Sequence, residues 1–511
     1  MIHRSPHPSV DIPITDVTSH VLNGVPKGEG PQLIDGPSGR KITGAELHRA
    51  VRALAAGLAE HGVGKGDVVA LHMPNLPEYA ICFHGVCSTG AVNTTVNPLY
   101  TARELAHQLR DSRARMLITV GAFLETARAA AADAGVDEIF VVGDADGATP
   151  VTDLLGDPEV APEPEIDPEV DLAVLPYSSG TTGLPKGVML THFNLVANLR
   201  QLQQVLPVEP DDVLIAVLPF FHIYGQTVLM NQGLLGGGQI VTMPRFDLDQ
   251  FLGLIAKHRV TKAYVVPPIA LALAKHPAID EADLSSLRLI MSGAAPLGEE
   301  LADQVATRIG CQTMQGYGMT ETSPVTHILP PDKGRGHGGK IGFPLPDTEC
   351  RVVDPDTSQD AERGELWMRG PQVMAGYLNN PEATASTIDS EGWLHTGDVA
   401  EVDSEGYFEI VDRLKELIKY KGFQVPPAEL EALLLTHPAV EDAAVIGVPD
   451  DECGELPKAF VVAGEGVTDE EIMDFVAERV SPQKRVRLVE RIDEVPKSPS
   501  GKILRRVLAD R

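Results

Sequence analysis

The sequence predicts an α/β protein in which a large N-terminal domain is followed by a smaller α+β domain. Helical and strand patterns alternate over residues 43–143 and again over 213–330, and each stretch predicts a doubly wound α/β subdomain. Short strands separated by Gly and Asp turns fill residues 341–411, which predicts a small β-barrel-like subdomain. From residue 427 the order of helix, two strands, helix and strand predicts the C-terminal domain.

Helix starts and strands can be placed in order along the first subdomain. Thr43 with Glu46, and Thr101 with Glu104, have the spacing of capping boxes, so helices are expected to begin there. Residues 156–171 are rich in Pro and acidic side chains, which predicts a linker or surface crossing. Apolar runs predict strands at residues 68–73, 116–120, 139–142 and 172–175.

The composition argues against several classes of function. The 511 residues carry a formal net charge of −30, which disfavours a general nucleic-acid-binding protein because such a protein needs a basic face. No run of about 18 apolar residues is present and the N-terminus lacks an apolar signal core, so we expect no membrane span and a cytoplasmic location. The cysteines are unclustered, which predicts reduced thiols without a zinc site or a disulfide framework. Because the chain as a whole is acidic, any anionic substrate must be held by local positive charge.

Residues 177–187, Tyr-Ser-Ser-Gly-Thr-Thr-Gly-Leu-Pro-Lys-Gly, have the composition of a phosphate-binding loop. Glycine lets the backbone approach an anion, hydroxyl groups donate to phosphate oxygens, and Lys186 supplies a point charge. The loop is not a P-loop, because Pro185 stands where the spacing from Gly180 requires the second glycine. Taken alone, the stretch also fits a flexible turn rich in Gly and Thr.

Residues 315–321 combine groups suited to a nucleotide. Gly316 and Gly318 leave space beside the backbone, and Tyr317 offers a flat face for adenine. Thr320 can donate to the α-phosphate, and Glu321 can hold Mg²⁺ as a hard oxygen ligand. The alternative is a strand turn bounded by glycine, with a surface glutamate.

Two other segments carry candidate pocket residues. In residues 219–225, His222 and Tyr224 lie among aromatic side chains, although a packed core histidine would give the same pattern. In residues 392–398, Asp398 can accept hydrogen bonds from both ribose hydroxyls or be an ordinary turn residue.

Together these motifs resemble the signature segments of the adenylate-forming superfamily: acyl-CoA synthetases, adenylation domains of peptide synthetases and beetle luciferases. Segments 221–224, 315–321, 412–424 and 496–504 look most like those of 4-coumarate–CoA ligases. The resemblance implies an ATP- and acyl-binding domain over residues 1–411, a hinge at 412–415 and a mobile C-terminal domain over 416–511.

The resemblance also implies the site residues. ATP and coenzyme A would be bound by Ser178, Ser179, Gly180, Thr181, Thr182, Gly183, Lys186, Gln315, Gly316, Tyr317, Gly318, Thr320, Asp398, Arg413, Lys421 and Gly422, with Mg²⁺ at Glu321. The acyl pocket would be formed by Tyr224, Ala294, Gly316, Gly318, Pro324 and Val325. Four residues would have catalytic roles: His222 beside the carboxylate, Lys502 in adenylation, and Lys419 with Gln424 in thioester formation.

The implied reaction has two steps. A carboxylate attacks the α-phosphate of ATP and releases pyrophosphate, and the coenzyme A thiolate then displaces AMP from the acyl-adenylate. The resemblance favours a cinnamate-type acid such as 4-coumarate, cinnamate or caffeate. His222 follows Phe221 where adenylation domains for amino acids usually carry an aspartate, which disfavours an amino-acid substrate. Val228 stands where the plant enzymes often have a small polar residue, so hydroxylated and unsubstituted rings remain alternatives.

Other classes share these nucleotide motifs. A medium-chain fatty acyl-CoA synthetase differs only in the shape of its acyl pocket. A luciferase-like oxygenase and a non-catalytic nucleotide-binding protein are further alternatives, and the complete set of motif residues disfavours the latter. The sequence is compatible with a monomer or a homodimer.

Overall fold

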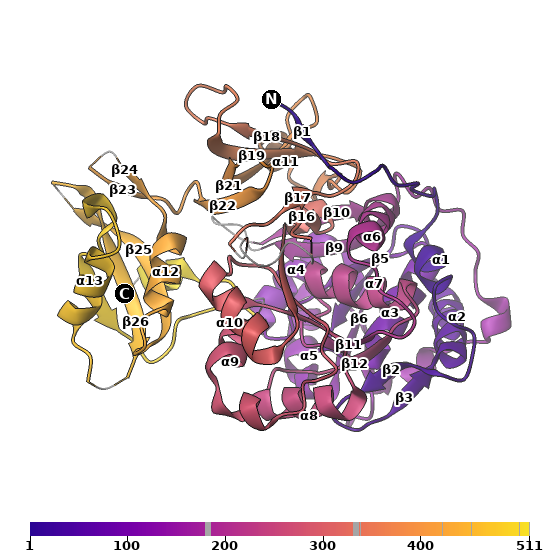
Figure 1. Cartoon of the computed structure of the whole chain (residues 1–511). Coiled ribbons are helices and arrows are strands. Elements are labelled where there is room, and N and C mark those ends of the chain that lie inside the picture. Colours follow the sequence, from indigo (N-terminus) through magenta and orange to yellow (C-terminus); the bar gives the residue numbers. More distant parts are fainter. Residues whose placement is uncertain are drawn as a thin grey trace.

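Four β-sheets organise the computed structural model of the chain (Figure 1). The structure describes residues 1–178, 185–330, 337, 339–421, 423–450, 452–464, 466–499, 501–509 and 511. Two large sheets with their helices form the main body, a small antiparallel sheet lies on top of it, and the C-terminal domain lies to its left in Figure 1. The predicted α/β fold with a smaller C-terminal α+β domain is confirmed.

The first large sheet has eight strands, and those from β9 to β8 run parallel. Its order is β20 (Gly376–Tyr377), β10 (Lys186–Thr191), β9 (Leu172–Ser178), β5 (Val92–Thr95), β4 (Val68–His72), β6 (Ala114–Val120), β7 (Glu138–Val142) and β8 (Thr149–Pro150). The predicted strands of the first subdomain are β4, β6, β7 and β9. Every residue of β4 is buried, because helices cover both faces of a parallel sheet.

The second large sheet has nine strands and positions the candidate site. Its order is β17 (Phe343–Pro344), β16 (Val325–Ile328), β15 (Gln312–Gly318), β14 (Leu289–Ser292), β13 (Lys262–Val265), β11 (Val213–Ala216), β12 (Gln239–Thr242), β2 (Pro31–Asp35) and β3 (Lys41–Thr43). Strands β11, β13, β14 and β15 run parallel, so the segments that follow their carboxyl ends meet at one edge. Those segments include 219–225, 293–297 and 319–321.

Helices surround both large sheets. They are α1 (Val17–Leu22), α2 (Gly44–Glu60), α3 (Pro77–Ser88), α4 (Ala102–Ser112), α5 (Leu124–Ala134), α6 (His192–Val205), α7 (Gln232–Leu235), α8 (Leu248–His258), α9 (Pro267–Lys275) and α10 (Glu299–Ile309). The predicted capping boxes at Thr43 and Thr101 begin α2 and α4. A π-helix, η4 (Tyr224–Asn231), follows β11, and such wide turns are frequent at functional sites.

The third sheet is small and antiparallel, and it includes the N-terminal strand. Its order is β1 (His3–Arg4), β18 (Glu349–Val353), β19 (Arg363–Arg369), β21 (Leu394–Val402) and β22 (Phe408–Arg413), with α11 (Pro381–Thr387) nearby in the sequence. This sheet corresponds to the predicted small β subdomain.

The C-terminal domain has its own sheet and apolar core. Its strands are β23 (Ile418–Tyr420), β24 (Phe423–Val425), β25 (Val440–Asp450), β26 (Gly454–Ala463) and β27 (Leu488–Arg491), and its helices are α12 (Pro427–Leu435), α13 (Asp469–Ala477) and α14 (Arg505–Ala509). The predicted order of helix, two strands, helix and strand is therefore confirmed. Ile418, Leu430, Val445 and Val461 belong to a cluster of buried residues formed within this domain.

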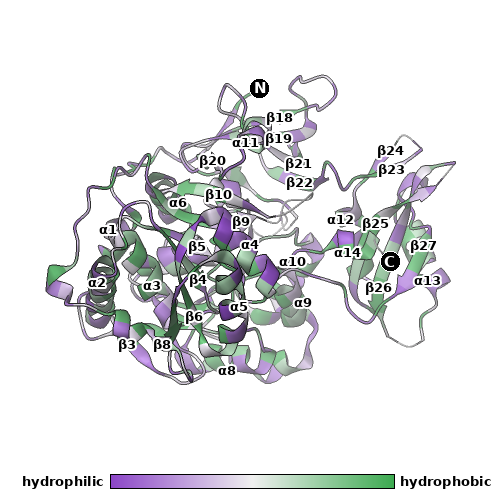
Figure 2. Ribbon diagram, turned by 180° about the vertical axis from the view of Figure 1, so that it is seen from behind, coloured by the Kyte–Doolittle hydropathy of each residue, from purple (hydrophilic) through white to green (hydrophobic). Residues whose placement is uncertain are grey.

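The main body shares one core that spans both large sheets. In Figure 2 the central strands are predominantly hydrophobic, while the peripheral loops are more hydrophilic. Among the described residues, no helix is both long and apolar enough to cross a membrane.

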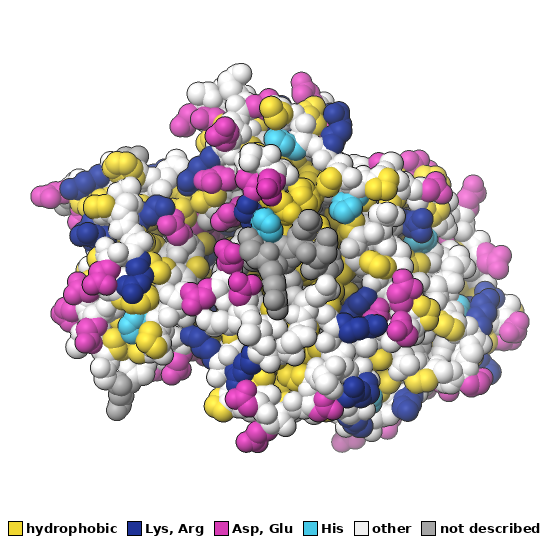
Figure 3. Space-filling view, in the orientation of Figure 1, with side chains coloured by type: hydrophobic (Ala, Val, Ile, Leu, Met, Phe, Trp, Pro, Cys, Tyr) yellow, Lys and Arg dark blue, Asp and Glu magenta, His cyan; other side chains and the backbone are white. Residues whose placement is uncertain are grey.

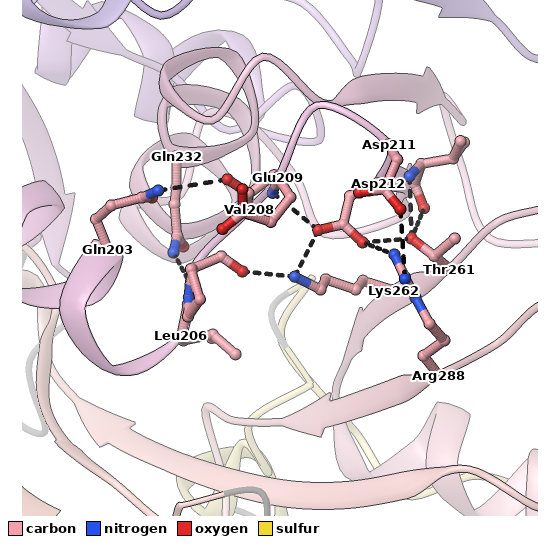
Figure 4. Close-up of polar contacts among 12 residues, drawn as sticks. Gln203, Leu206, Val208, Glu209, Asp211, Asp212, Gln232, Thr261, Lys262 and Arg288 are labelled. Carbon is pink, nitrogen blue, oxygen red and sulfur yellow. Dashed lines mark hydrogen bonds and ion pairs between the residues drawn. The ribbon is translucent and has the colours of Figure 1, made fainter.

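Asp212 ties together the starts of three parallel strands, at the edge opposite the candidate site (Figure 4). Its side chain is 1% exposed and contacts Lys262 Nζ at 2.6 Å and an Arg288 nitrogen at 2.6 Å. The Thr261 hydroxyl and the Glu209 amide also donate to it, at 2.8 and 2.9 Å. Burial alone would raise the pKa of Asp212, but these donors, Lys262 above all, lower it overall.

We expect Asp212→Asn to lower the free energy of unfolding by about 3 kcal/mol at pH 7, because it leaves the Lys262 charge without its buried partner. Since the pKa of Asp212 is lowered in the folded state, its contribution is present at neutral pH and is lost as the pH falls below about 4. Urea unfolding between pH 7 and 3 should show the two proteins converging. Asp211→Asn, at a side chain that is 73% exposed, is the control and should change stability by less than about 0.5 kcal/mol. A stability difference that is as large at pH 3 as at pH 7 would contradict this role.

Candidate active site

A pocket that is partly open to solvent lies at the carboxyl edge of the nine-stranded sheet. Its lining is mostly apolar or aromatic, with a few polar groups, as is common for small-molecule sites. The lining residues are His222, Ile223, Tyr224, Met291, Gly293, Ala294, Gly316, Tyr317, Gly318, Met319, Thr320, Pro324, Val325 and Lys502. The structure thus brings all six predicted acyl-pocket residues together with His222 and Lys502.

His222 is a neutral hydrogen-bond donor in this pocket. The Tyr224 backbone N–H donates to His222 Nδ1 at 3.3 Å, so the ring proton lies on Nε2. Burial, and then the charge of Lys502, lower the pKa of His222 to about 3. The histidine can therefore donate from Nε2 to an oxygen of a bound ligand, but it cannot supply a positive charge at neutral pH.

Tyr224 forms a flat wall of the pocket. It begins the π-helix η4, and a Cβ added at Gly293 would lie only 3.0 Å from its ring. Within the described part of the chain its buried hydroxyl has no hydrogen-bond partner. Burial without a partner is costly, so this hydroxyl is suited to a polar group of a ligand. Val228, one turn further along η4, is fully buried and does not line the pocket.

Two glycines of β15 lie close to neighbouring atoms. A Cβ at Gly318 would lie 2.0 Å from the Pro324 carbonyl oxygen, and one at Gly316 would lie 2.4 Å from Met291 Cε. A side chain at Gly318 would therefore displace the backbone at Pro324, whereas one at Gly316 would meet only the flexible end of the Met291 side chain.

Asp398, Arg413 and Tyr317 form a polar cluster beside the pocket. Cross-strand pairing of β21 with β22 sets Asp398 opposite Arg413, whose Nε lies 3.3 Å from Asp398 Oδ1. The Tyr317 hydroxyl donates to Asp398 Oδ2 at 2.5 Å. Burial raises the pKa of Asp398, although Arg413 and Tyr317 counteract this. The carboxylate is thus held in place with an adjacent cation.

Glu321 is fixed by two hydroxyl donors. Ser178 Oγ and the Tyr377 hydroxyl donate to Glu321 Oε1 at 3.0 and 2.8 Å, and the glutamate is 6% exposed. Lys186 Nζ lies 4.3 Å from the centre of the Tyr377 ring. No group of three or more His, Cys, Asp or Glu in the described residues has a metal-binding arrangement. A single carboxylate still fits Mg²⁺, because that ion is usually held by one or two carboxylates together with substrate phosphates.

The phosphate-binding loop is described only at its two ends. Ser178 and Lys186 are opposite each other in the pairing of β9 with β10. The predicted nucleotide-binding residues Ser179, Gly180, Thr181, Thr182 and Gly183 lie outside the described residues, as does Gly422. On the face drawn in Figure 3, Lys and Arg side chains are scattered among acidic ones rather than gathered into one patch.

Lys502 reaches the pocket from the C-terminal domain. Its loop is closed by hydrogen bonds from Ser498 N–H to the Lys502 carbonyl at 2.8 Å and from Lys502 N–H to Ser498 Oγ at 3.1 Å. Immediately after the loop, Arg505 contacts both oxygens of Glu431 at 2.8 Å and Glu416 at 2.9 Å. Burial, and then Arg413, lower the pKa of Lys502, whereas Asp398 and Glu321 raise it. The loop is therefore anchored at its base while its lysine enters a pocket of the main body.

The structure does not bring the other predicted catalytic residues to this pocket. Lys419 and Gln424 face each other across the hairpin of β23 and β24, and both are exposed. Lys421 has a φ of 49°, in the left-handed region, so its backbone is not extended. Lys419 and Lys421 are therefore not two residues on one face of a regular strand. The described pocket is lined by Lys502 alone among the predicted lysines.

The contributing residues that sequence reasoning missed include Met291 and Tyr377. Met291 lies in β14, and its place in the lining depends on the close approach of β15. Tyr377 comes from the two-residue strand β20 at the edge of the other sheet, and no local pattern marks it.

A body of two α/β sheets, with a nucleotide-type polar cluster and a lysine delivered by a second domain, is the architecture of an adenylate-forming enzyme. The family model of AMP-binding enzymes matches residues 26–378, and the model of the AMP-binding enzyme C-terminal domain matches residues 429–502. The chain therefore belongs to the family of AMP-binding enzymes, and the predicted membership of the adenylate-forming superfamily is confirmed.

Individual relatives agree with this assignment. A 4-coumarate–CoA ligase 3 of Oryza sativa subsp. japonica is 46% identical over 95% of this chain and 90% of its own length. The anthranilate CoA ligase AuaEII in complex with anthranoyl-AMP has a TM-score of 0.89 at 28% identity, covering 97% of both chains. ATP-bound MatB from Rhodopseudomonas palustris has a TM-score of 0.87 at 30% identity and apo MatB one of 0.78, each covering 98% of this chain and 99% of its own.

We expect His222→Ala to lower kcat/KM for the acid substrate about tenfold, because a hydrogen bond to the carboxylate is lost. His222→Gln, which keeps an N–H donor, should retain more activity. Because the pKa of His222 is about 3, neither variant should change the shape of the pH–rate profile between pH 6 and 8. Disappearance of an acid limb near pH 6.5 in either variant would show that His222 titrates in the reaction.

Proposed function

We propose that this protein is an ATP-dependent carboxylate–CoA ligase that activates cinnamate-type acids as adenylates and transfers them to coenzyme A. The observation that carries the proposal is the meeting of Lys502 with an apolar, aromatic-walled pocket that contains His222. In a protein with a net charge of −30, this meeting supplies a cation where two anionic reactants must approach each other.

In the first half-reaction the carboxylate is the nucleophile and needs no base, because it is ionised at neutral pH. We assign its orientation to the Nε2–H of His222 and to Lys502, whose ammonium also stabilises charge on the α-phosphate. Asp398 would accept the ribose hydroxyls, with Arg413 beside it, and Lys186 with Thr181, Thr182 and Thr320 would bind the phosphates. Mg²⁺ at Glu321 would neutralise phosphate charge.

In the second half-reaction the C-terminal domain would turn about a hinge at residues 412–415, with Lys415 as the pivot. Lys419 and Gln424 would then replace Lys502 at the pocket, with Lys421 and Gly422 beside the bound coenzyme A. The separate apolar core of the C-terminal domain supports this motion, because the domain can move without exposing it. The higher TM-score to the ATP-bound MatB structure supports assigning the present pose to adenylation.

Pocket shape favours an aromatic acid. The Tyr224 ring and the backbone at Gly316 and Gly318 would enclose a planar group, with Ala294 and Val325 at its edges. The unpartnered Tyr224 hydroxyl would bond a polar ring substituent. The 46% identical rice relative is named a 4-coumarate–CoA ligase, which agrees with this substrate class.

Acid-dependent AMP release with coenzyme A should be strong for cinnamate, 4-coumarate and caffeate and weak for octanoate and amino acids. Tyr224→Phe should lower kcat/KM about tenfold for 4-coumarate and less than about threefold for cinnamate, because only the former has a ring hydroxyl to lose its partner. Turnover of octanoate alone would instead make the protein a medium-chain fatty acyl-CoA synthetase.

The two half-reactions separate the roles of the two lysines. Lys502→Ala should reduce adenylate formation, measured as acid-dependent ATP–pyrophosphate exchange, by at least about a hundredfold while sparing thioester formation from supplied acyl-adenylate. Lys419→Ala should show the converse. Equal loss of both half-reactions in either variant would refute its assigned role.

A further inference from the structure

Helix α12 of the C-terminal domain is held at both of its ends by side chains of the main body. In Figures 1 and 2 this helix lies beside α9 and α10. A helix leaves unpaired N–H groups at its start and unpaired carbonyls at its end, with partial positive and negative charge respectively. Partners at the two ends therefore need opposite charges, and the main body supplies both.

Asp412 serves the amino end of α12. The helix begins at Pro427 after Pro426, and no side chain of its own caps the first turn. Asp412 Oδ2 instead accepts the Ala428 N–H at 2.9 Å. Asp412 is the first residue of the predicted hinge. It is 5% exposed and lies in β22, where it pairs with Val399 of β21, so its position is fixed by the small sheet of the main body.

Lys275 serves the carboxyl end of α12. The last turn of the helix contains no basic residue of its own. Lys275, the final residue of α9, donates from Nζ to the Leu435 carbonyl at 3.0 Å and to the Val440 carbonyl at 3.4 Å. The Lys275 side chain is exposed, so its hydrogen bonds contribute only modestly to the stability of this domain arrangement. They form only while the end of α12 lies beside α9.

We propose that Asp412 and Lys275 are positioning residues that clamp α12 and thereby hold the C-terminal domain in the pose that delivers Lys502 to the pocket. Both precede residue 415 in the chain, whereas the atoms that they contact follow it, so a turn of the C-terminal domain about that point breaks both contacts. The clamp stabilises one pose without touching either substrate. It therefore sets the balance between the two half-reactions, a consequence that rests on the proposed function.

Single-turnover measurements of the two half-reactions test the clamp. Lys275→Ala should slow pyrophosphate release about two- to fivefold, because a helix-end contact of this kind is weak. Thioester formation from supplied acyl-adenylate should be unchanged or faster. Lys275→Arg keeps the cation and should restore pyrophosphate release. Lys257→Ala removes an equally exposed lysine from the last turn of α8 and should alter neither step.

Hydrogen exchange without substrates separates the clamp from the proposed function. Lys275→Ala should speed amide exchange in peptides that cover α9 and α12, and Asp412→Asn should speed it at the start of α12. If Lys275→Ala speeds exchange but the unsubstituted protein adenylates no acid, the clamp is supported and the proposed function is overturned. Unchanged exchange together with normal half-reactions would overturn the clamp, as would equal slowing of both half-reactions in Lys275→Ala.

Discussion

The arrival of Lys502 in a pocket built by another domain is the contact on which the rest of the site depends. The pocket itself is mostly apolar, and the chain as a whole is strongly acidic, so an anionic ligand there has few nearby cations to neutralise it. The lysine comes from a short loop whose base is locked by the Arg505 contacts to Glu431 and Glu416. The loop thus has an anchored base and an ammonium group that reaches the pocket.

Burial decides how each ionisable group near this lysine behaves. Burial makes His222 a neutral donor. It also raises the pKa of Asp398, an effect that the charge of Arg413 and the hydrogen bond from Tyr317 oppose. The same desolvation strengthens any charge interaction that forms when a ligand excludes water. The pocket therefore holds His222 as a neutral donor, together with the ammonium group of Lys502.

The two edges of the nine-stranded sheet have different tasks. At the amino edge, Asp212 joins three strands through Lys262, Arg288 and Thr261, and no pocket-lining residue takes part. At the carboxyl edge, glycines and a π-helix leave the space that the pocket occupies. A buried ion-pair cluster thus joins the strands at one edge, and room for a ligand is left at the edge where the strands end.

Sequence alone determined the order of elements and the chemical type of the site. Capping boxes at Thr43 and Thr101, apolar runs such as that of β4, and the motif around Glu321 are local patterns, and each keeps its meaning whatever the rest of the chain does. His222, Tyr224, Ala294 and Lys502 could be named as candidates for one site because their segments resemble those of adenylate-forming enzymes.

Only the tertiary structure decided which of these candidates meet. Lys502 lines the pocket while Lys419 does not, because the pose of a domain is fixed by contacts between residues far apart in the sequence. Tyr377, which holds Glu321, and Lys275, which holds α12, come from distant segments and have no local signature. The pKa shifts of His222 and Asp398 likewise follow first from burial, a property that exists only once the chain has folded.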